Sequence, residues 1–201
     1  MKLYSYIVAR DYGFAPNPFH GFCTLATCKP GIRGTAQIGD WVVGTGSSAN
    51  NRSGYIVFAM RVIEAMTFNE YWCDRRFSAK RPNLSGSRKK RFGDNIYHRA
   101  PNSGDWVQED SHHSYEYGRP NQSNIKRDTK SDRVLISDCY IYWGGYGPEI
   151  PSRFRSKGIV ISGQGYKYKF PEAHVRSFVR WINSHNDRGY LNRPLDWDKE
   201  A

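Results

Sequence analysis

Residues 37–47 read QIGDWVVGTGS, and this segment sets the expected fold of the chain. Gly39-Asp40 is a turn dipeptide, and the run after it is rich in β-branched and aromatic side chains, which favours a buried strand. After a polar loop at residues 49–53, a longer apolar run at residues 54–63 predicts a second strand. The two strands form a hairpin. The backbone N–H groups around Gly44-Thr45-Gly46 make its mouth the place where we expect a ligand.

Other segments supply the partners of this hairpin. Residues 3–9 predict a strand with apolar or aromatic side chains on both faces, which is typical of a central strand, and residues 133–143 predict a strand pair. Thr67 and Glu70 have capping-box spacing and begin a short helix that runs to about residue 74. A longer helix begins near residue 171, with an apolar stripe formed by Val175, Phe178, Val179 and Ile182. We therefore predict an α+β fold, a mixed β-barrel or strongly curved sheet with a short helix and a C-terminal helix.

The overall charge of the chain is strongly positive. Among 201 residues, Lys and Arg number 30 and Asp and Glu number 19, which gives a formal net charge of +11. This length predicts a single domain spanning residues 1–201, and this charge favours a polyanionic partner: DNA, RNA or a nucleotide. The four cysteines lack paired CxxC spacing, and neither a signal-peptide core nor a membrane-spanning apolar run is present. These features indicate a cytoplasmic protein that makes no membrane contact.

The positive charge is concentrated in one segment. Residues 75–99 contain nine basic residues and one acid, Asp94, together with proline, glycine and serine. We expect a basic, loop-rich insertion over residues 75–130, approximately, which binds phosphates. The candidate phosphate-binding residues are Arg75, Arg76, Lys80, Arg88, Lys89, Lys90 and Arg91.

Three residues are candidates for catalysis. Asp11 follows the first predicted strand, where it serves either as an acid or base or as an organiser of the loop. Cys28 precedes Lys29, whose ammonium favours the thiolate of a neighbouring cysteine, although no histidine can be assigned as its base from the sequence. The alternative for Cys28 is a small buried thiol beside a loop. Whether the protein is an enzyme is therefore left open.

No metal or cofactor is predicted. His20, Cys23 and Cys28 are close in sequence, but a tetrahedral zinc site needs a fourth ligand from elsewhere in the chain. The segment Gly44-Thr45-Gly46-Ser47 lacks the lysine and the spacing of a Walker loop, and no dinucleotide-binding fingerprint follows a predicted strand.

Aromatic residues interleaved with charge are the stronger pattern. Around Trp72, aromatic side chains that could stack on bases lie beside arginines; the alternative is that Trp72 belongs to the core. The residues that we expect to contact a base or nucleotide are Tyr12, Asn17, Phe19, Trp41, Thr45, Ser47 and Trp72.

The chain resembles the bacterial and phage-borne family called nucleotide modification associated domain 2. The resemblance rests on residues 5–11, 13–19, 23–30, 39–47 and 134–137. It implies a link to nucleic-acid base modification and supplies no catalytic residues. A looser similarity, over residues 39–47 and 55–64, is to the PUA-like group of small β-barrels, which includes the EVE, YTH and ASCH domains. That similarity implies RNA binding or an aromatic cage for a modified base.

Three functions follow from these observations. The leading hypothesis is a nucleic-acid-binding module that recognises a modified or flipped base and is associated with nucleotide or DNA base modification. The alternative is an enzyme that modifies or hydrolyses a nucleotide or base, with Asp11, Asn17, Cys28 and Lys29 near the reaction centre. The third is an interaction protein that has no affinity for polyanions.

Overall fold

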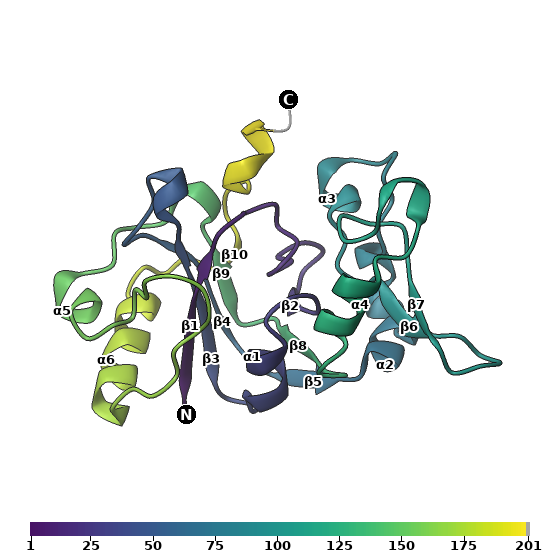
Figure 1. Cartoon of the computed structure of the whole chain (residues 1–201). Coiled ribbons are helices and arrows are strands. Elements are labelled where there is room, and N and C mark those ends of the chain that lie inside the picture. The colour runs from purple at the N-terminus through teal and green to yellow at the C-terminus, as the bar shows by residue number, and fades with distance from the viewer. Residues whose placement is uncertain (200–201) are drawn as a thin grey trace. The chain divides into compact units, whose positions relative to one another are not determined.

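The computed structural model describes residues 1–199, whose fold is mixed α+β with several sheets (Figure 1). The chain divides into two compact units, each assembled from separate segments. The first unit comprises Met1–Tyr12, Ala36–Ile63 and the chain from Ser137 onward, and the second comprises Gly13–Thr35 and Glu64–Ile136. The basic insertion predicted over residues 75–130 lies within the second unit. That the whole chain is one domain stays a prediction.

The first unit contains a five-stranded sheet. Its strands, in the spatial order β1-β3-β4-β9-β10, are Leu3–Val8, Trp41–Gly46, Ile56–Arg61, Tyr140–Tyr142 and Gly189–Tyr190. The predicted central hairpin is confirmed: β3 and β4 pair antiparallel, with Val43 opposite Ala59. At Gly44 an added Cβ would lie 2.4 Å from the Phe58 ring, so the close packing of β3 against this ring requires glycine.

Two features of this sheet differ from the prediction. β1 is an edge strand, not a central one, because its outer side pairs only at Ser5, which exchanges backbone hydrogen bonds with Lys167. This loop contact covers part of the edge. Both faces of β1 are apolar because both are packed: Leu3 lies in the core with α6, and Tyr4 stacks on Tyr168. The barrel form of the prediction is wrong for the described residues: the sheet runs from β1 to β10 and does not close.

Two helices complete the first unit, α5 (Ser152–Arg155) and α6 (Glu172–Asn183). The predicted C-terminal helix is confirmed in α6, because Val175, Phe178 and Ile182 are buried in the core that includes residues of β1, β3, β4 and β9. Burial of this stripe holds α6 on one face of the sheet (Figure 1).

The second unit has two smaller sheets. One has the order β2-β8-β5, with strands Cys23–Leu25, Val134–Ser137 and Glu64–Met66, and the other pairs β6 (Tyr97–Arg99) with β7 (Trp106–Gln108). Its helices are α1 (Pro30–Thr35), α2 (Phe68–Cys73), α3 (Arg88–Arg91) and α4 (Gln122–Asp128). The predicted short helix is confirmed in α2, whose Thr67 and Glu70 form the reciprocal hydrogen bonds of a capping box.

The helices of the described chain are too short or too polar to cross a membrane.

Candidate functional site

The turn between β2 and α1 contains an unusual backbone conformation at a cysteine. Cys28 and Lys29 have φ angles of 57° and 40°, which lie in the left-handed region that residues other than glycine and asparagine rarely adopt. Such conformations persist only where the surroundings enforce them, and they are concentrated at functional sites. Pro30 then begins α1, so that Cys28 lies on a sharp strand-to-helix turn. Nucleophilic serines of α/β-hydrolases occupy the same kind of turn, which exposes the nucleophile.

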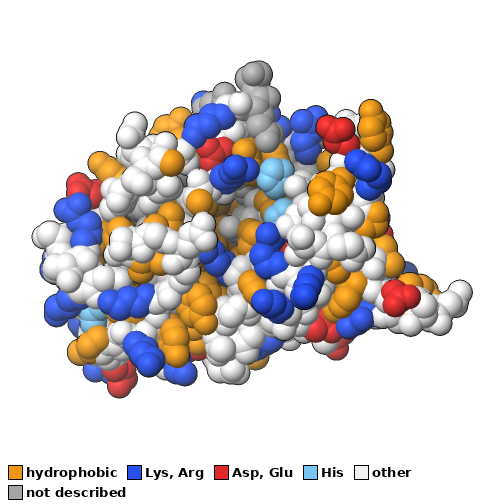
Figure 2. Space-filling model, viewed as in Figure 1, with side chains coloured by type: hydrophobic (Ala, Val, Ile, Leu, Met, Phe, Trp, Pro, Cys, Tyr) orange, Lys and Arg blue, Asp and Glu red, His pale blue; other side chains and the backbone are white. Residues whose placement is uncertain are grey.

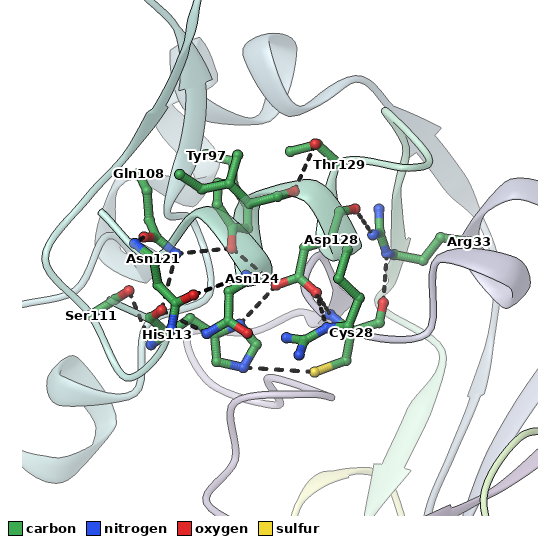
Figure 3. Close-up of polar contacts among 12 residues, drawn as sticks. Cys28, Arg33, Tyr97, Gln108, Ser111, His113, Asn121, Asn124, Asp128 and Thr129 are labelled. Carbon is green, nitrogen blue, oxygen red and sulfur yellow. Dashed lines mark hydrogen bonds and ion pairs between the residues drawn. The ribbon is translucent and has the colours of Figure 1, made fainter. Parts of the chain in front are cut away.

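Cys28 forms the first member of a triad with His113 and Asp128 (Figure 3). Its Sγ lies 3.8 Å from Nε2 of His113. The other ring nitrogen of His113, Nδ1, lies 2.8 Å from Oδ2 of Asp128. Asp128 is fully buried, whereas Cys28 and His113 are partly exposed, so the thiol can meet a substrate while the carboxylate stays inside. All three residues belong to the second unit.

Both oxygens of the Asp128 carboxylate accept hydrogen bonds. The Tyr97 hydroxyl donates to Oδ2 over 3.0 Å, and Nε of Arg127 donates to Oδ1 over 3.1 Å. The backbone N–H of Cys28 also donates to Oδ1, over 3.2 Å. Asp128 therefore fixes both the histidine ring and the backbone of the cysteine turn.

His113 is positioned by contacts to its backbone and its ring. Its carbonyl accepts hydrogen bonds from Nε2 of Gln108 over 3.1 Å and from Nδ2 of Asn124 over 2.8 Å. Phe14 packs edge to face on the imidazole, with the ring centroids 4.6 Å apart. The ring is thus locked in the orientation that points Nε2 at the thiol.

Arg33 supports the turn from within. Its side chain is buried, and Nε donates to the Cys28 carbonyl over 2.9 Å while the guanidinium also donates to the Asp128 carbonyl. Burial lowers the pKa of Arg33 to about 10, so the group stays positively charged at neutral pH. These bonds join the cysteine turn to the end of α4 and help to hold the left-handed backbone at Cys28.

The electrostatics of the triad favour an ion pair. Burial lowers the pKa of His113, but its hydrogen bonds to Asp128 and Cys28 outweigh burial and raise the pKa to about 9. Burial raises the pKa of Asp128, and the hydrogen bond from His113 and the charges of His113 and Arg127 bring it below its ordinary value. The imidazole is therefore protonated at neutral pH and places a positive charge beside the Cys28 sulfur. A nucleophile, a base and a group that orients the base are the three parts of covalent catalysis.

The same three side chains offer ligand atoms within 4.8 Å of one another, which raises the question of a metal. Their arrangement fits a metal poorly, because Cys28 and Asp128 contact opposite nitrogens of the His113 ring. An ion between Sγ and Nε2 would leave the Asp128 oxygen that bonds Nδ1 in an outer position, and zinc needs three or four direct protein ligands.

The other two predicted catalytic residues have different surroundings. Lys29 is half-buried, and burial lowers the pKa of its ammonium. Asp11 lies in the first unit, where its carboxylate accepts hydrogen bonds from the Tyr142 hydroxyl and, over 3.1 Å, from the backbone N–H of Leu195. These contacts are those of a loop organiser, the alternative that the sequence left open for Asp11.

Sequence reasoning missed His113 and Asp128. The histidine was visible only as one of an adjacent pair, and it lies 85 positions from Cys28. Asp128 follows two basic residues at the end of a short helix, where nothing in the local pattern marks it. The signal that was present is the cysteine followed by a lysine and then by a helix-starting Pro30.

At the hairpin mouth, where a ligand was expected, the structure has a cavity of about 10 Å³ lined in part by Asp11, Ser47 and Asn50. This space accommodates a single water molecule and no base. Ser47 caps the short helical turn that follows β3, accepting a hydrogen bond from Ala49 N over 3.2 Å. Thr45 is fully buried, and Trp41 is part of the hydrophobic core.

The remaining residues predicted to contact a base fall in both units. The backbone oxygen of Tyr12 accepts a hydrogen bond from the Trp197 indole over 2.9 Å. Asn17 and Phe19 are buried. Trp72 has one face stacked on His98, with the ring centroids 4.2 Å apart, and the guanidinium of Arg81 lies 3.9 Å from its centroid. Their roles in binding a base stay predictions.

The predicted phosphate-binding residues differ in exposure. Arg75, Lys89 and Arg91 are exposed, and Arg88 and Lys90 are half-buried on the same short α3 region. Arg76 is exposed but forms ion pairs with Glu64 and Asp74 at 2.9 and 2.7 Å. Basic side chains outnumber acidic ones on the face seen in Figure 2.

Lys80 is an exception among these cations. It is completely buried, and its ammonium donates to both oxygens of Asn17 and to the Phe22 carbonyl. Burial lowers the pKa of this ammonium to about 8. In this position Lys80 cross-links the interior of the unit and does not reach a phosphate on the surface.

Comparison with known proteins adds one finding. Neither the curated proteins nor the solved structures give a match to this chain. The family model described as nucleotide modification associated domain 2 matches residues 1–201, the whole chain, and so agrees with the resemblance carried by the sequence. The protein that holds this Cys28–His113–Asp128 triad therefore belongs to the nucleotide modification associated domain 2 family.

Proposed function

We propose that this chain is an enzyme of nucleotide modification that uses Cys28 as a covalent nucleophile for acyl transfer. The observation that carries the proposal is the contact of one imidazole with both the Cys28 sulfur, at 3.8 Å, and the Asp128 carboxylate, at 2.8 Å. The family description, nucleotide modification associated domain 2, supports a nucleotide as the class of substrate. The strained turn at Cys28 supports the proposal independently, since it presents a partly exposed sulfur.

The first half of the reaction forms a thioester. The Cys28 thiolate attacks the carbonyl carbon of an acyl donor, and the C–S bond forms as the bond to the leaving group breaks. The His113 imidazolium gives its Nε2 proton to the departing group and becomes neutral. Asp128 keeps the Nδ1 proton in place, so that Nε2 remains the nitrogen that exchanges protons with the reacting groups.

The second half transfers the acyl group. Neutral His113 takes a proton from an amino or hydroxyl group of the nucleotide, which attacks the thioester carbon. An amide or ester bond forms, the C–S bond breaks, and the thiolate and imidazolium are restored. Water in place of the nucleotide would hydrolyse the thioester by the same steps.

Thiol reactivity tests the nucleophile, because the chain contains a built-in reference cysteine. Cys73 is exposed and lies outside the triad. With limiting iodoacetamide at pH 6.5, peptide mass spectrometry should show Cys28 modified at least about tenfold faster than Cys73, since only a thiolate reacts. His113→Gln should bring Cys28 to the rate of Cys73, and Cys73→Ser should leave Cys28 unchanged. Equal rates for the two cysteines in the unaltered protein would remove the basis of the proposal.

Acyl transfer itself is measured with an activated ester. Mixing the protein with p-nitrophenyl acetate should release a burst of p-nitrophenol equal to the enzyme concentration, and Cys28→Ser should lack that burst. A nucleotide that carries an aminoalkyl group should speed the decay of the acyl-enzyme relative to water alone. A burst without any acceleration by the nucleotide would indicate a hydrolase with a different substrate.

A second candidate is a nucleic-acid-binding module that recognises a modified or flipped base, with the PUA-like similarity as its model. The observation that favours it is the net charge of +11 together with the basic residues of α3. Replacing Arg88, Lys89, Lys90 and Arg91 together by glutamine should weaken DNA or RNA binding and flatten its dependence on salt, because each lost phosphate contact lowers the slope by about 0.9. An unchanged slope would exclude α3 from phosphate binding.

A further inference from the structure

We propose that the first unit contains a second binding site, a cationic cavity that takes a phosphoryl group. The cavity has a volume of about 180 Å³ and is lined by Arg153, Phe154, Lys157, Ala173, His174 and Ser177. Its walls are the region of α5 and the first turns of α6. The site is separate from the triad, which lies in the second unit, and does not depend on the proposed acyl transfer.

The sequence around this cavity is basic without compensation. Residues 150–171 contain five Lys or Arg residues and no Asp or Glu. Within the described part of the chain, two neighbouring arginines are paired with the acids that flank this segment: Arg155 with Glu149 at 2.7 Å, and Arg176 with Glu172. Arg153 and Lys157, which line the cavity, have no ion-pair partner among the same residues. The uncompensated charge therefore faces the cavity, where an anion would neutralise it.

A third cation is fixed beside the cavity by the backbone. The Lys167 ammonium donates to the Lys157 carbonyl over 3.3 Å. It can approach this closely because residue 158 is glycine: a Cβ there would lie 2.3 Å from the ammonium nitrogen. Gly158 also has a φ of +83°, which disfavours other residues.

His174 reports the positive potential of this region. Its side chain is only 6% exposed, and within residues 1–199 its Nε2 is buried without a hydrogen-bond partner. Burial lowers the pKa of this imidazole, and the charges of Lys157 and Lys167 lower it further. A buried polar atom without a hydrogen-bond partner destabilises the folded protein. Neighbouring cations that lack a counter-charge repel one another and do so as well.

The first turn of α6 adds donors to the cavity wall. α6 has 12 residues, and Pro171, which precedes it, gives the helix no side-chain cap. The N–H groups at such a helix end carry partial positive charge and bind phosphate readily, and Ala173 brings this end to the cavity. The cationic side chains, Ser177 and the first turn of α6 therefore line one space of a size that fits a phosphoryl group, and the acid of that turn, Glu172, is paired with Arg176.

The probes that test this site are inorganic phosphate and 2′-deoxyadenosine 5′-monophosphate, titrated separately while the ring signals of His174 are followed by NMR. We expect saturable shifts at millimolar ligand or below with at least one probe. Arg153→Gln combined with Lys157→Gln should weaken binding at least tenfold. The matched control, Arg155→Gln combined with Arg176→Gln, removes two cations of the same region and should change binding less than twofold.

The two probes distinguish a nucleotide from inorganic phosphate as the source of the phosphoryl group. Tighter binding of the nucleotide than of inorganic phosphate assigns the site to a nucleotide, and equal binding assigns it to phosphate alone. The absence of saturation with both probes, or an equal loss in the control variant, would overturn the proposal. The readout is binding in the first unit, so a failure here leaves the test of Cys28 unaffected.

Discussion

Asp11 in the first unit and Asp128 in the second are both buried carboxylates that bond the backbone of a turn or loop, yet only Asp128 also contacts a histidine that faces a cysteine. The donors to Asp11 are the Tyr142 hydroxyl and the backbone N–H of Leu195. The donors to Asp128 include His113, whose other nitrogen faces a partly exposed thiol. A buried carboxylate can take part in chemistry when its hydrogen-bond partner can transfer a proton. The number of hydrogen bonds that the carboxylate accepts does not indicate this.

The two regions also differ in how far their polar residues are covered by other parts of the chain. The hairpin mouth beside Asp11 is filled by the C-terminal segment, where Asp196 accepts a hydrogen bond from the Asp11 backbone over 2.6 Å and Leu195 lines the small cavity. At the turn in the second unit, Cys28 is partly exposed and its backbone is left-handed. A strand end rich in glycine and hydroxyl groups can thus be covered by another segment of the same chain, and it need not bind a ligand.

Removal of Asp128 should have the largest effect. Asp128→Ala leaves the buried Tyr97 hydroxyl, the His113 ring and the Cys28 N–H without their acceptor, so we expect a loss of about 3–5 kcal/mol in the free energy of unfolding. Urea denaturation at pH 7 measures it. Asp110→Ala, at an exposed site outside the triad, serves as the control and should cost less than about 1 kcal/mol. Similar losses for the two variants would mean that the hydrogen bonds to Asp128 contribute no more to stability than an exposed acid does.

The charge on His113 should make stability depend on pH. Because folding raises the pKa of this imidazole from 6.5 to about 9, its stabilising contribution is complete below pH 6.5 and is lost as the pH rises through 9. The full difference corresponds to about 3 kcal/mol. Lys80 acts in the opposite sense, since burial lowers its pKa from 10.5 to about 8 and stability rises as this group loses its proton.

Comparison with a variant separates these two contributions. The difference in unfolding free energy between the unaltered protein and His113→Gln, measured by urea denaturation from pH 6 to 10, should shrink with rising pH, because Lys80 contributes equally to both proteins. A difference that stays constant over this range would show that His113 is neutral in the folded state.

Asp11→Asn should have the smallest effect and should bear only on stability. An amide keeps the size of the carboxylate but loses its charge and one acceptor, so we expect a loss of about 1–3 kcal/mol in unfolding free energy. The rate of Cys28 alkylation at pH 6.5 should not change. A slower Cys28 reaction in a folded Asp11→Asn protein would show that the hairpin mouth takes part in the chemistry, and the distinction between the two regions would fail.

Local signals made parts of this fold predictable. The β3–β4 hairpin, the capping box of α2 and the apolar stripe of α6 are each encoded within one short continuous segment, where periodicity and capping residues act directly. The edge position of β1 depends on its contact with Lys167, which no pattern within residues 3–9 reveals. The division into two units depends likewise on pairings between distant segments.

The candidate site was predictable only in part, for a similar reason. Cys28 was singled out because of its neighbour Lys29, but its left-handed conformation gave no signal, since neither residue is a glycine or asparagine. His113 and Asp128 reach it through a loop and a short helix whose path is set by tertiary packing. A triad is a spatial pattern, and one sequence without its fold does not contain the distances that define it.

The interleaved order of the two units has a consequence for how the chain is made. All segments of the second unit have been synthesised once the ribosome passes Ile136. At that point the sheet of the first unit still lacks β9 and β10, which follow in the sequence. Neither unit can be excised as one continuous fragment, because each is interrupted by the other. A chain that stops after Ile136 would carry every residue of the triad while leaving the hairpin of β3 and β4 without its neighbour β9 and without α6.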